Sequence, residues 1–190
     1  VLAMSANNTG WLGTTAIKGG VILVTNANAL GGVATNTISM PVTSGLNPGQ
    51  TATGALHLSG GIILPNNISL GANNGSMGIN FGGIVRSVSG SNTLAGTIAH
   101  ISGNGSMWAA APGASLNFAG VGTWTNSPTF SGGGTINFDT VPNLATPTIG
   151  IIEGTTVNLN VDGSAAGKFS PNQVIVRNGS FVLRSACLLY

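Results

Sequence analysis

Few side chains in this sequence could do chemistry, and they are widely spaced. Asp139, Glu153 and Asp162 are its three acidic residues, and it has two histidines. Glycosidic hydrolysis needs two carboxylates facing one bond across about 5–9 Å, and Ca²⁺ takes about six to eight oxygen ligands. Nothing in the spacing indicates either arrangement, and the sequence has no GxSxG, HExxH, phosphate-loop or CxxC motif. We therefore expect no enzyme activity, no catalytic residues, no metal site and no cofactor.

The remaining reactive side chains also have ordinary structural interpretations. His57 lies between Leu56 and Leu58 in an alternating segment, so its side chain is predicted to face solvent or a partner. His100 receives the same prediction from its own neighbours. The single cysteine, Cys187, is interpreted as a small buried apolar residue.

The tryptophans leave two alternatives open. Trp108 precedes a run of three alanines and a proline. An exposed Trp108 or Trp124 would suit stacking on a sugar or contact with a subunit, whereas a buried one would pack in the core. The phenylalanines are predicted to pack in the core rather than to form a ligand platform. They are Phe81, Phe118, Phe130, Phe138, Phe169 and Phe181.

Composition narrows the class of protein. Only 4% of the 190 residues are charged, against about 25% in ordinary soluble domains. The five basic residues are scattered along the chain, whereas nucleic acids and anionic membranes attract clustered ones. No apolar run reaches the length of about 18 residues that a membrane-spanning helix needs. We expect no nucleic-acid partner and no membrane span.

The elements that must position these residues are strands. Residues 155–161 read TTVNLNV, which puts Val157 and Leu159 on one face and Asn158 and Asn160 on the other. Such segments are separated by turn signals rich in Gly and Asn, and strong helix formers are scarce. The other alternating segments are 55–59, 115–118 and 134–139. This pattern predicts an all-β chain.

Three all-β architectures fit that pattern: a solenoid, a sandwich and a barrel. Uncharged Asn, Ser and Thr can stack as ladders along the outer face of a solenoid, where like charges would repel. A sandwich usually carries Lys and Glu on its solvated faces, and this sequence has no such pattern. We favour the solenoid, with a β-sandwich that receives a donated strand as the alternative.

Three segments resemble a known repeat, in the order in which that repeat has them. Residues 8–24 read NTGWLGTTAIKGGVILV and are followed by Ala29-Leu30-Gly31. Residues 54–70 and 84–98 follow, the latter reading IVRSVSGSNTLAGTI. Together they resemble the autotransporter-associated β-strand repeat over roughly residues 1–125, with Leu94 where that family usually has Trp. The resemblance implies a parallel β-helix exported to the outside of a bacterial cell.

We therefore expect a single β-solenoid domain over residues 1–190, with a repeat-like part at 1–125 and a divergent part at 126–190. At about 20 residues a coil, the chain would form about nine coils. The residues predicted to fill its interior are Val21, Leu23, Leu56, Leu58, Leu116, Phe118, Ile136, Phe138, Val157 and Leu159.

The apolar segment 180–190 is predicted to pair with another copy by strand addition. The expected subunit-contact residues in it are Phe181, Leu183, Leu188, Leu189 and Tyr190. The leading functional hypothesis is a non-catalytic structural protein, a secreted cell-surface rod or a self-assembling filament subunit. The alternative is a carbohydrate-binding adhesin or a degraded polysaccharide-active β-helix enzyme, in which Trp108 or Trp124 meets surface glycans.

Overall fold

Short alternating segments of the chain form strands that stack in parallel as a β-solenoid. A computed structural model describes residues 1–41, 43–46, 50–52, 54–71, 82–100, 106–140, 142–144, 148–161 and 169–184. All regular structure in these residues is β. The parallel stack confirms the solenoid and rules out the sandwich that was its alternative.

All but two of the described strands lie in three parallel sheets. The first sheet contains β1 (Leu2–Met4), β3 (Val21–Val24), β7 (Ala55–Ser59), β10 (Val85–Ser89), β13 (Ser106–Ala110), β16 (Pro128–Ser131), β19 (Thr148–Ile151) and β21 (Gln173–Val176). The second contains β8 (Ile63–Leu64), β11 (Ser91–Leu94), β14 (Ser115–Phe118), β17 (Thr135–Phe138), β20 (Thr155–Leu159) and β22 (Gly179–Leu183). The third contains β2 (Thr15–Ala16), β4 (Ile38–Met40), β9 (Ile68–Leu70), β12 (Ile98–His100), β15 (Gly122–Trp124) and β18 (Asn143–Leu144).

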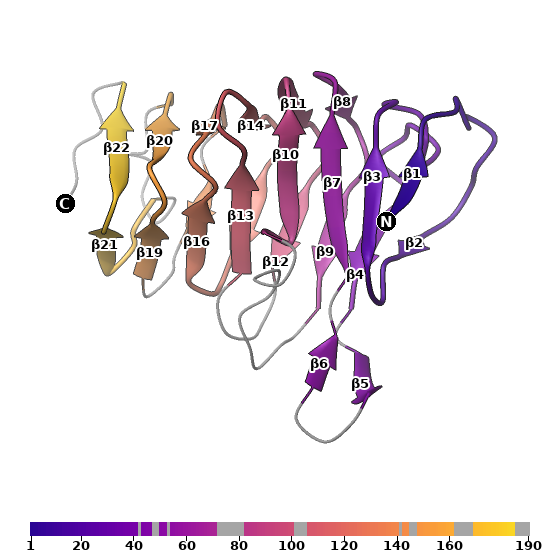
Figure 1. Ribbon diagram of the computed structural model, residues 1–190, viewed down its shortest axis with the longest axis horizontal. Helices are drawn as coiled ribbons and strands as arrows, with labels where there is room; N and C mark the ends of the chain where they lie inside the picture. The colour runs from indigo at the N-terminus through magenta and orange to yellow at the C-terminus, as the bar shows by residue number, and fades with distance from the viewer. Residues whose placement is uncertain are drawn as a thin grey trace.

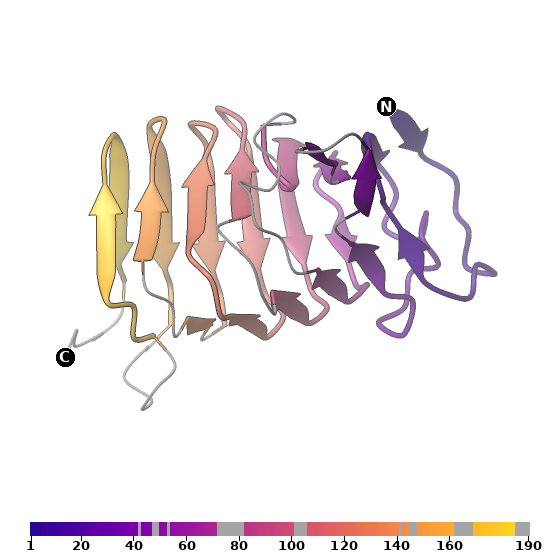
Figure 2. The same ribbon diagram turned by 90° about the horizontal axis from the view of Figure 1, so that it is seen from below.

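Successive coils follow one another along the long axis of the molecule (Figures 1 and 2). A typical coil passes through all three sheets in turn, as β7, β8 and β9 do before β10 begins the next coil. The antiparallel hairpin of β5 (Thr43–Leu46) and β6 (Gln50–Ala52) departs from this pattern and projects away from the stack (Figure 1).

The expected number of coils was wrong. The second and third sheets have six strands each, so the described residues make about six turns rather than nine. The prediction assumed one short, constant coil length. The coil from Ser115 to its partner Thr135 has that length, but the coil from Val21 to its partner Ala55 is much longer. Insertions such as the β5–β6 hairpin lengthen individual coils without adding a turn.

Inward side chains of successive coils form columns along the solenoid. In parallel strands that are in register, each inward residue lies beside the paired inward residue of the next coil. One column of the first sheet is apolar along its whole length. It runs Leu2, Ile22, Leu56, Val85, Trp108, Phe130, Ile151 and Val176. Its six interior members contribute to the core, and most are fully buried.

Aromatic side chains fill the middle of the solenoid. The Phe118 and Phe138 rings are stacked with centroids 4.8 Å apart, and the Trp108 ring packs edge-on against Phe118 at 5.4 Å. Trp124 packs against the same cluster. Trp108 is 0% exposed and Trp124 is 1% exposed, so core packing is the alternative that the structure supports for both tryptophans. Phe81, also predicted to lie in the core, is outside the described residues.

Most of the predicted interior residues are buried, but the phase of one strand was wrong. Leu23 pairs with the outward His57, whereas Ile22 and Val24 pair with the buried Leu56 and Leu58. Val21 has the same outward phase as Leu23. The run VILV is apolar throughout, so it contains no alternation from which its inward face could be read.

Buried asparagines tie the corners of the coils together. Asn92 Oδ1 accepts hydrogen bonds from the backbone N–H groups of Gly61 and Ile62 at 3.1 and 3.0 Å. Its Nδ2 donates to Ser87 Oγ and to the Ser89 carbonyl, both at 2.8 Å. One side chain therefore satisfies backbone groups of the preceding coil that have no strand partner at the bend.

Candidate functional site

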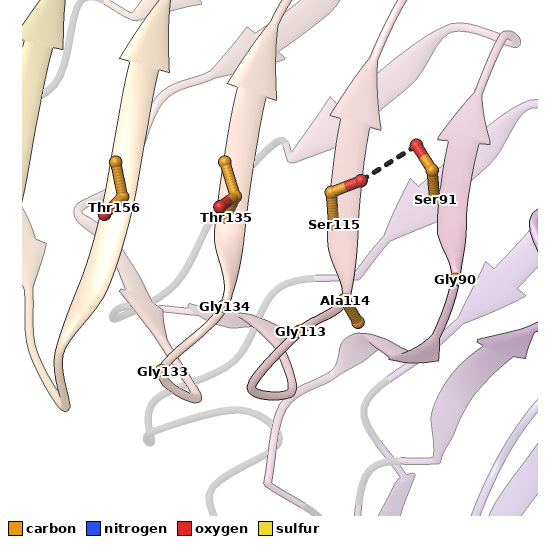
Figure 3. A pocket seen from close by; sticks show the side chains of 9 residues that line it. All are labelled: Gly90, Ser91, Gly113, Ala114, Ser115, Gly133, Gly134, Thr135 and Thr156. Atoms are coloured by element: carbon orange, nitrogen blue, oxygen red, sulfur yellow. Dashed lines mark hydrogen bonds between the residues drawn. The ribbon is translucent and has the colours of Figure 1, made fainter.

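The outer face of the second sheet carries uncharged polar side chains in two rows. The row nearer the first sheet consists of Ser91, Ser115, Thr135, Thr156 and Ser180, which are in register on adjacent strands. Ser115 Oγ and Ser91 Oγ are hydrogen-bonded at 2.8 Å. The turns beside this row contain glycines, and together they form a shallow groove of about 360 Å³ (Figure 3).

The second row is a hydrogen-bonded asparagine ladder. Asn137 Nδ2 donates to Asn117 Oδ1, and Asn158 Nδ2 donates to Asn137 Oδ1, each at 2.7 Å. The ladder ends in bonds from Asn117 to Thr93 Oγ1 and from Arg184 Nε to Asn158. This observation confirms the predicted outer ladder. Its amides are largely used between coils, so it holds the coils in register.

The described carboxylates lie at opposite ends of the second-sheet strands. Glu153 precedes β20, and its carboxylate accepts a hydrogen bond from the Gly132 backbone at 3.1 Å. Asp139 follows β17, and its carboxylate accepts a bond from Asn160 Nδ2 at 2.7 Å. The length of strand between Glu153 and Asp139 is about 20 Å. This is well beyond the separation of the two catalytic carboxylates in a glycosidase. Asp162, the third acid, lies outside the described residues.

The two histidines occupy different environments. His57 lies on the outer face of the first sheet, between Leu23 and Arg86, and is half-buried. His100 is fully buried, so the prediction that it faces solvent or a partner was wrong. In its strand, β12, Ile98 and His100 point inward and Ala99 points outward. Burial lowers the pKa of the His100 imidazole from 6.5.

The predicted subunit-contact segment is only partly described. Phe181 and Leu183 belong to β22, pair with Val157 and Leu159, and pack partly buried against the core. The Phe181 ring also stacks on Phe169 with centroids 5.8 Å apart. Leu188, Leu189, Tyr190 and Cys187 lie outside the described residues.

The ends of the apolar column in the first sheet are exposed, which the sequence analysis missed. Leu2 is 58% exposed on β1, and Val176 is 46% exposed on β21. These strands are the two edges of the sheet, so each has a neighbour on one side only in the described structure. Alternation alone does not identify Leu2 and Val176 as the ends of this column. Finding them also requires knowing which residues of successive strands are paired.

The proposed tryptophan ligand contacts are not available on the surface. Trp108 Nε1 donates to Ser106 Oγ at 2.7 Å inside the core. A side chain that is 0% or 1% exposed has no face on which a sugar could stack. Among the described residues, Trp11 is the tryptophan with a large exposed fraction, 51%.

Comparison with known proteins gives no match: no protein family, no curated protein and no solved structure is similar enough to this chain. The resemblance to the autotransporter-associated repeat therefore stays a prediction. In the described part of the chain, no group of three or more His, Cys, Asp or Glu side chains lies close enough to hold a metal ion. No helix there is long and apolar enough to cross a membrane.

Proposed function

We propose that this chain is a non-catalytic structural segment of an extracellular β-rod, and that copies of it stack head to tail. The observation that carries this proposal is the apolar column of the first sheet. Its end members, Leu2 and Val176, are exposed on opposite edges of the stack, while those between are buried or partly buried. Seating Val176 of one copy against Leu2 of the next would continue the column.

Parallel stacking makes this contact self-propagating. All strands of the three solenoid sheets pair in parallel, so the last coil presents the same strand direction that the first coil requires. Such a contact joins two different surfaces, and contacts of this kind build open filaments rather than closed dimers. Exposed strand edges also supply unpaired backbone N–H and C=O groups for the junction.

Side-chain chemistry also supports a structural role. The carboxylates of Glu153 and Asp139 both hold neighbouring coils together through hydrogen bonds. The outer polar row of asparagines does the same. A secreted location rests on the three repeat-like segments, and the low charge of the chain fits a surface that associates with copies of itself.

Charged substitutions at the two ends test this proposal. Leu2→Lys and Val176→Lys each place an ammonium group in the apolar column at the junction, where burying an unpaired charge is unfavourable. Val121→Lys is the matched control, because Val121 is 57% exposed but lies between β14 and β15, away from both edges. Molecular mass would be measured by light scattering after gel filtration, with circular dichroism to check the fold.

The wild type and Val121→Lys are expected to form concentration-dependent assemblies, and either end variant is expected to stay a monomer. Substoichiometric Val176→Lys should also shorten wild-type assemblies, because it retains one competent edge. Assemblies that persist unchanged in both end variants would contradict the head-to-tail junction.

A further inference from the structure

A second groove lies on the outer face of the first sheet, around Gly150. It has a volume of about 290 Å³, close to the lower limit of about 300 Å³ for small-molecule pockets. The residues around it that matter here are Thr129, Thr148, Ile152, Ile175 and Arg177. This groove is on the side of the solenoid, whereas copies are proposed to stack at its ends.

The groove exists because one outward position lacks a side chain. Gly150 pairs with Thr129 on one neighbouring strand and with Ile175 on the other. A residue with a Cβ there would fill the space between them, and that Cβ would lie 3.2 Å from Thr129 Oγ1. Glycine inside a strand weakens it, and often marks a place where a ligand approaches the backbone closely.

The lining of the groove is chemically mixed. It includes three hydroxyl-bearing residues, Ser127, Thr129 and Thr148, and three apolar residues, Pro128, Ile152 and Ile175. A sugar ring has the matching combination, with hydroxyl groups at its edge and C–H groups on its faces. The uncharged part of the lining therefore suits a single sugar unit.

Arg177 adds a positive charge to this groove. It is exposed, and no carboxylate among the described residues forms an ion pair with it. Glu153, which precedes the neighbouring coil's β20, has its carboxylate bonded to the Gly132 backbone. A guanidinium group binds carboxylates in a two-pronged geometry that a neutral sugar does not use.

We propose that the Gly150 groove binds an acidic sugar unit of a polysaccharide, with its carboxylate on Arg177 and its ring over Gly150. The two threonine hydroxyls bond the ring hydroxyls, and the two isoleucines cover its apolar face. The charge of Arg177 selects an acidic unit over a neutral one. The rod thus has a lateral glycan contact beside its end-to-end junction, because Ile175 and Arg177 flank the junction residue Val176.

Titration calorimetry with tri-galacturonate tests this site, with its methyl ester as the uncharged ligand control. Arg177→Gln removes the charge, and Gly150→Val fills the groove with a residue that favours strands. Arg86→Gln is the matched protein control, because Arg86 lies on the same face, in β10, outside the groove. Circular dichroism checks that each variant keeps its β structure.

We expect saturable binding of tri-galacturonate to the wild type and to Arg86→Gln. Arg177→Gln should weaken it about tenfold or more, as loss of a charge-assisted hydrogen bond does, and Gly150→Val should abolish it. The methyl ester should bind the wild type as weakly as the acid binds Arg177→Gln. Absence of binding to the wild type overturns the proposal, as does equal affinity in Arg177→Gln and Arg86→Gln.

Discussion

At the scale of single residues, His100 places an ionisable ring inside an apolar column of the third sheet. This column runs Met40, Leu70, His100, Trp124 and Leu144. Among the described residues, neither ring nitrogen of His100 has a hydrogen-bond partner, and burial lowers the pKa of the imidazole from 6.5. Since a protonated ring would be an unpaired buried charge, the folded protein holds this side chain neutral.

Acidification is therefore expected to destabilise the fold through His100. Below about pH 6.5 the unfolded chain binds a proton at this residue and the folded chain does not, so the free energy of unfolding falls as the pH falls. The free energy of unfolding stops falling below the lowered pKa of the folded state, because His100 is then protonated in both states. Urea unfolding between pH 7.5 and 5 would measure it. His100→Leu should flatten the slope, and an identical slope in wild type and variant would contradict this account.

At the corner between the first and second sheets, Asn92 accepts hydrogen bonds from two backbone N–H groups. Asn92→Ala leaves the N–H groups of Gly61 and Ile62 without their acceptor in a buried place. The expected loss in the free energy of unfolding is about 2–4 kcal/mol. Asn160→Ala, which removes an exposed bond to Asp139, should cost less than about 1 kcal/mol. Equal losses in denaturant unfolding would show that the corner does not depend on Asn92.

At the scale of the element, the closest approach between coils limits the side chains that a corner accepts. A Cβ on Gly120 would overlap the carbonyl oxygen of Gly96 in the preceding coil. The backbone of these two coils cannot move apart without breaking the hydrogen bonds between their strands. Gly120→Ala is therefore expected to lower the free energy of unfolding by at least about 2 kcal/mol. Gly19→Ala is the control, because nothing lies within 4 Å of its Cβ position. Thermal melting compares the two, and similar melting temperatures would contradict close packing at this corner.

Alternation in the sequence was sufficient to predict the strands and most of their inward faces. Leu56, Leu58, Ile136 and Phe138 are buried as their spacing indicated. Where alternation is absent, as in Val21–Val24, only the pairing with β7 shows which residues point inward. His100 shows the same limit, since its flanking residues suggested an outward phase that the pairing of β12 does not allow.

The candidate sites were harder to predict than the fold. Trp108 and Trp124 drew attention because of residue type, yet packing in the centre of the solenoid buries both. The Gly150 groove depends on which residues three separate strands place side by side. Coil length is not constant along the chain. The spacing of residues in the sequence therefore does not show which of them lie side by side around Gly150.

At the scale of the whole molecule, the solenoid is a stack with two different edges and one repeated strand direction. Each inner coil is sandwiched between neighbours, whereas β1 and β21 are paired on one side only in the described structure. Stability in such a stack depends on contacts between neighbouring coils. An added coil from another copy would bury the exposed Leu2 and Val176 and so lower the free energy of both edges.

Negative-stain electron microscopy of the purified chain under native conditions tests the head-to-tail rod most directly. We expect unbranched filaments of the width of one solenoid, with stacked strands repeating at about 4.8 Å in diffraction from aligned specimens. Isolated short rods that do not lengthen with increasing protein concentration would contradict it.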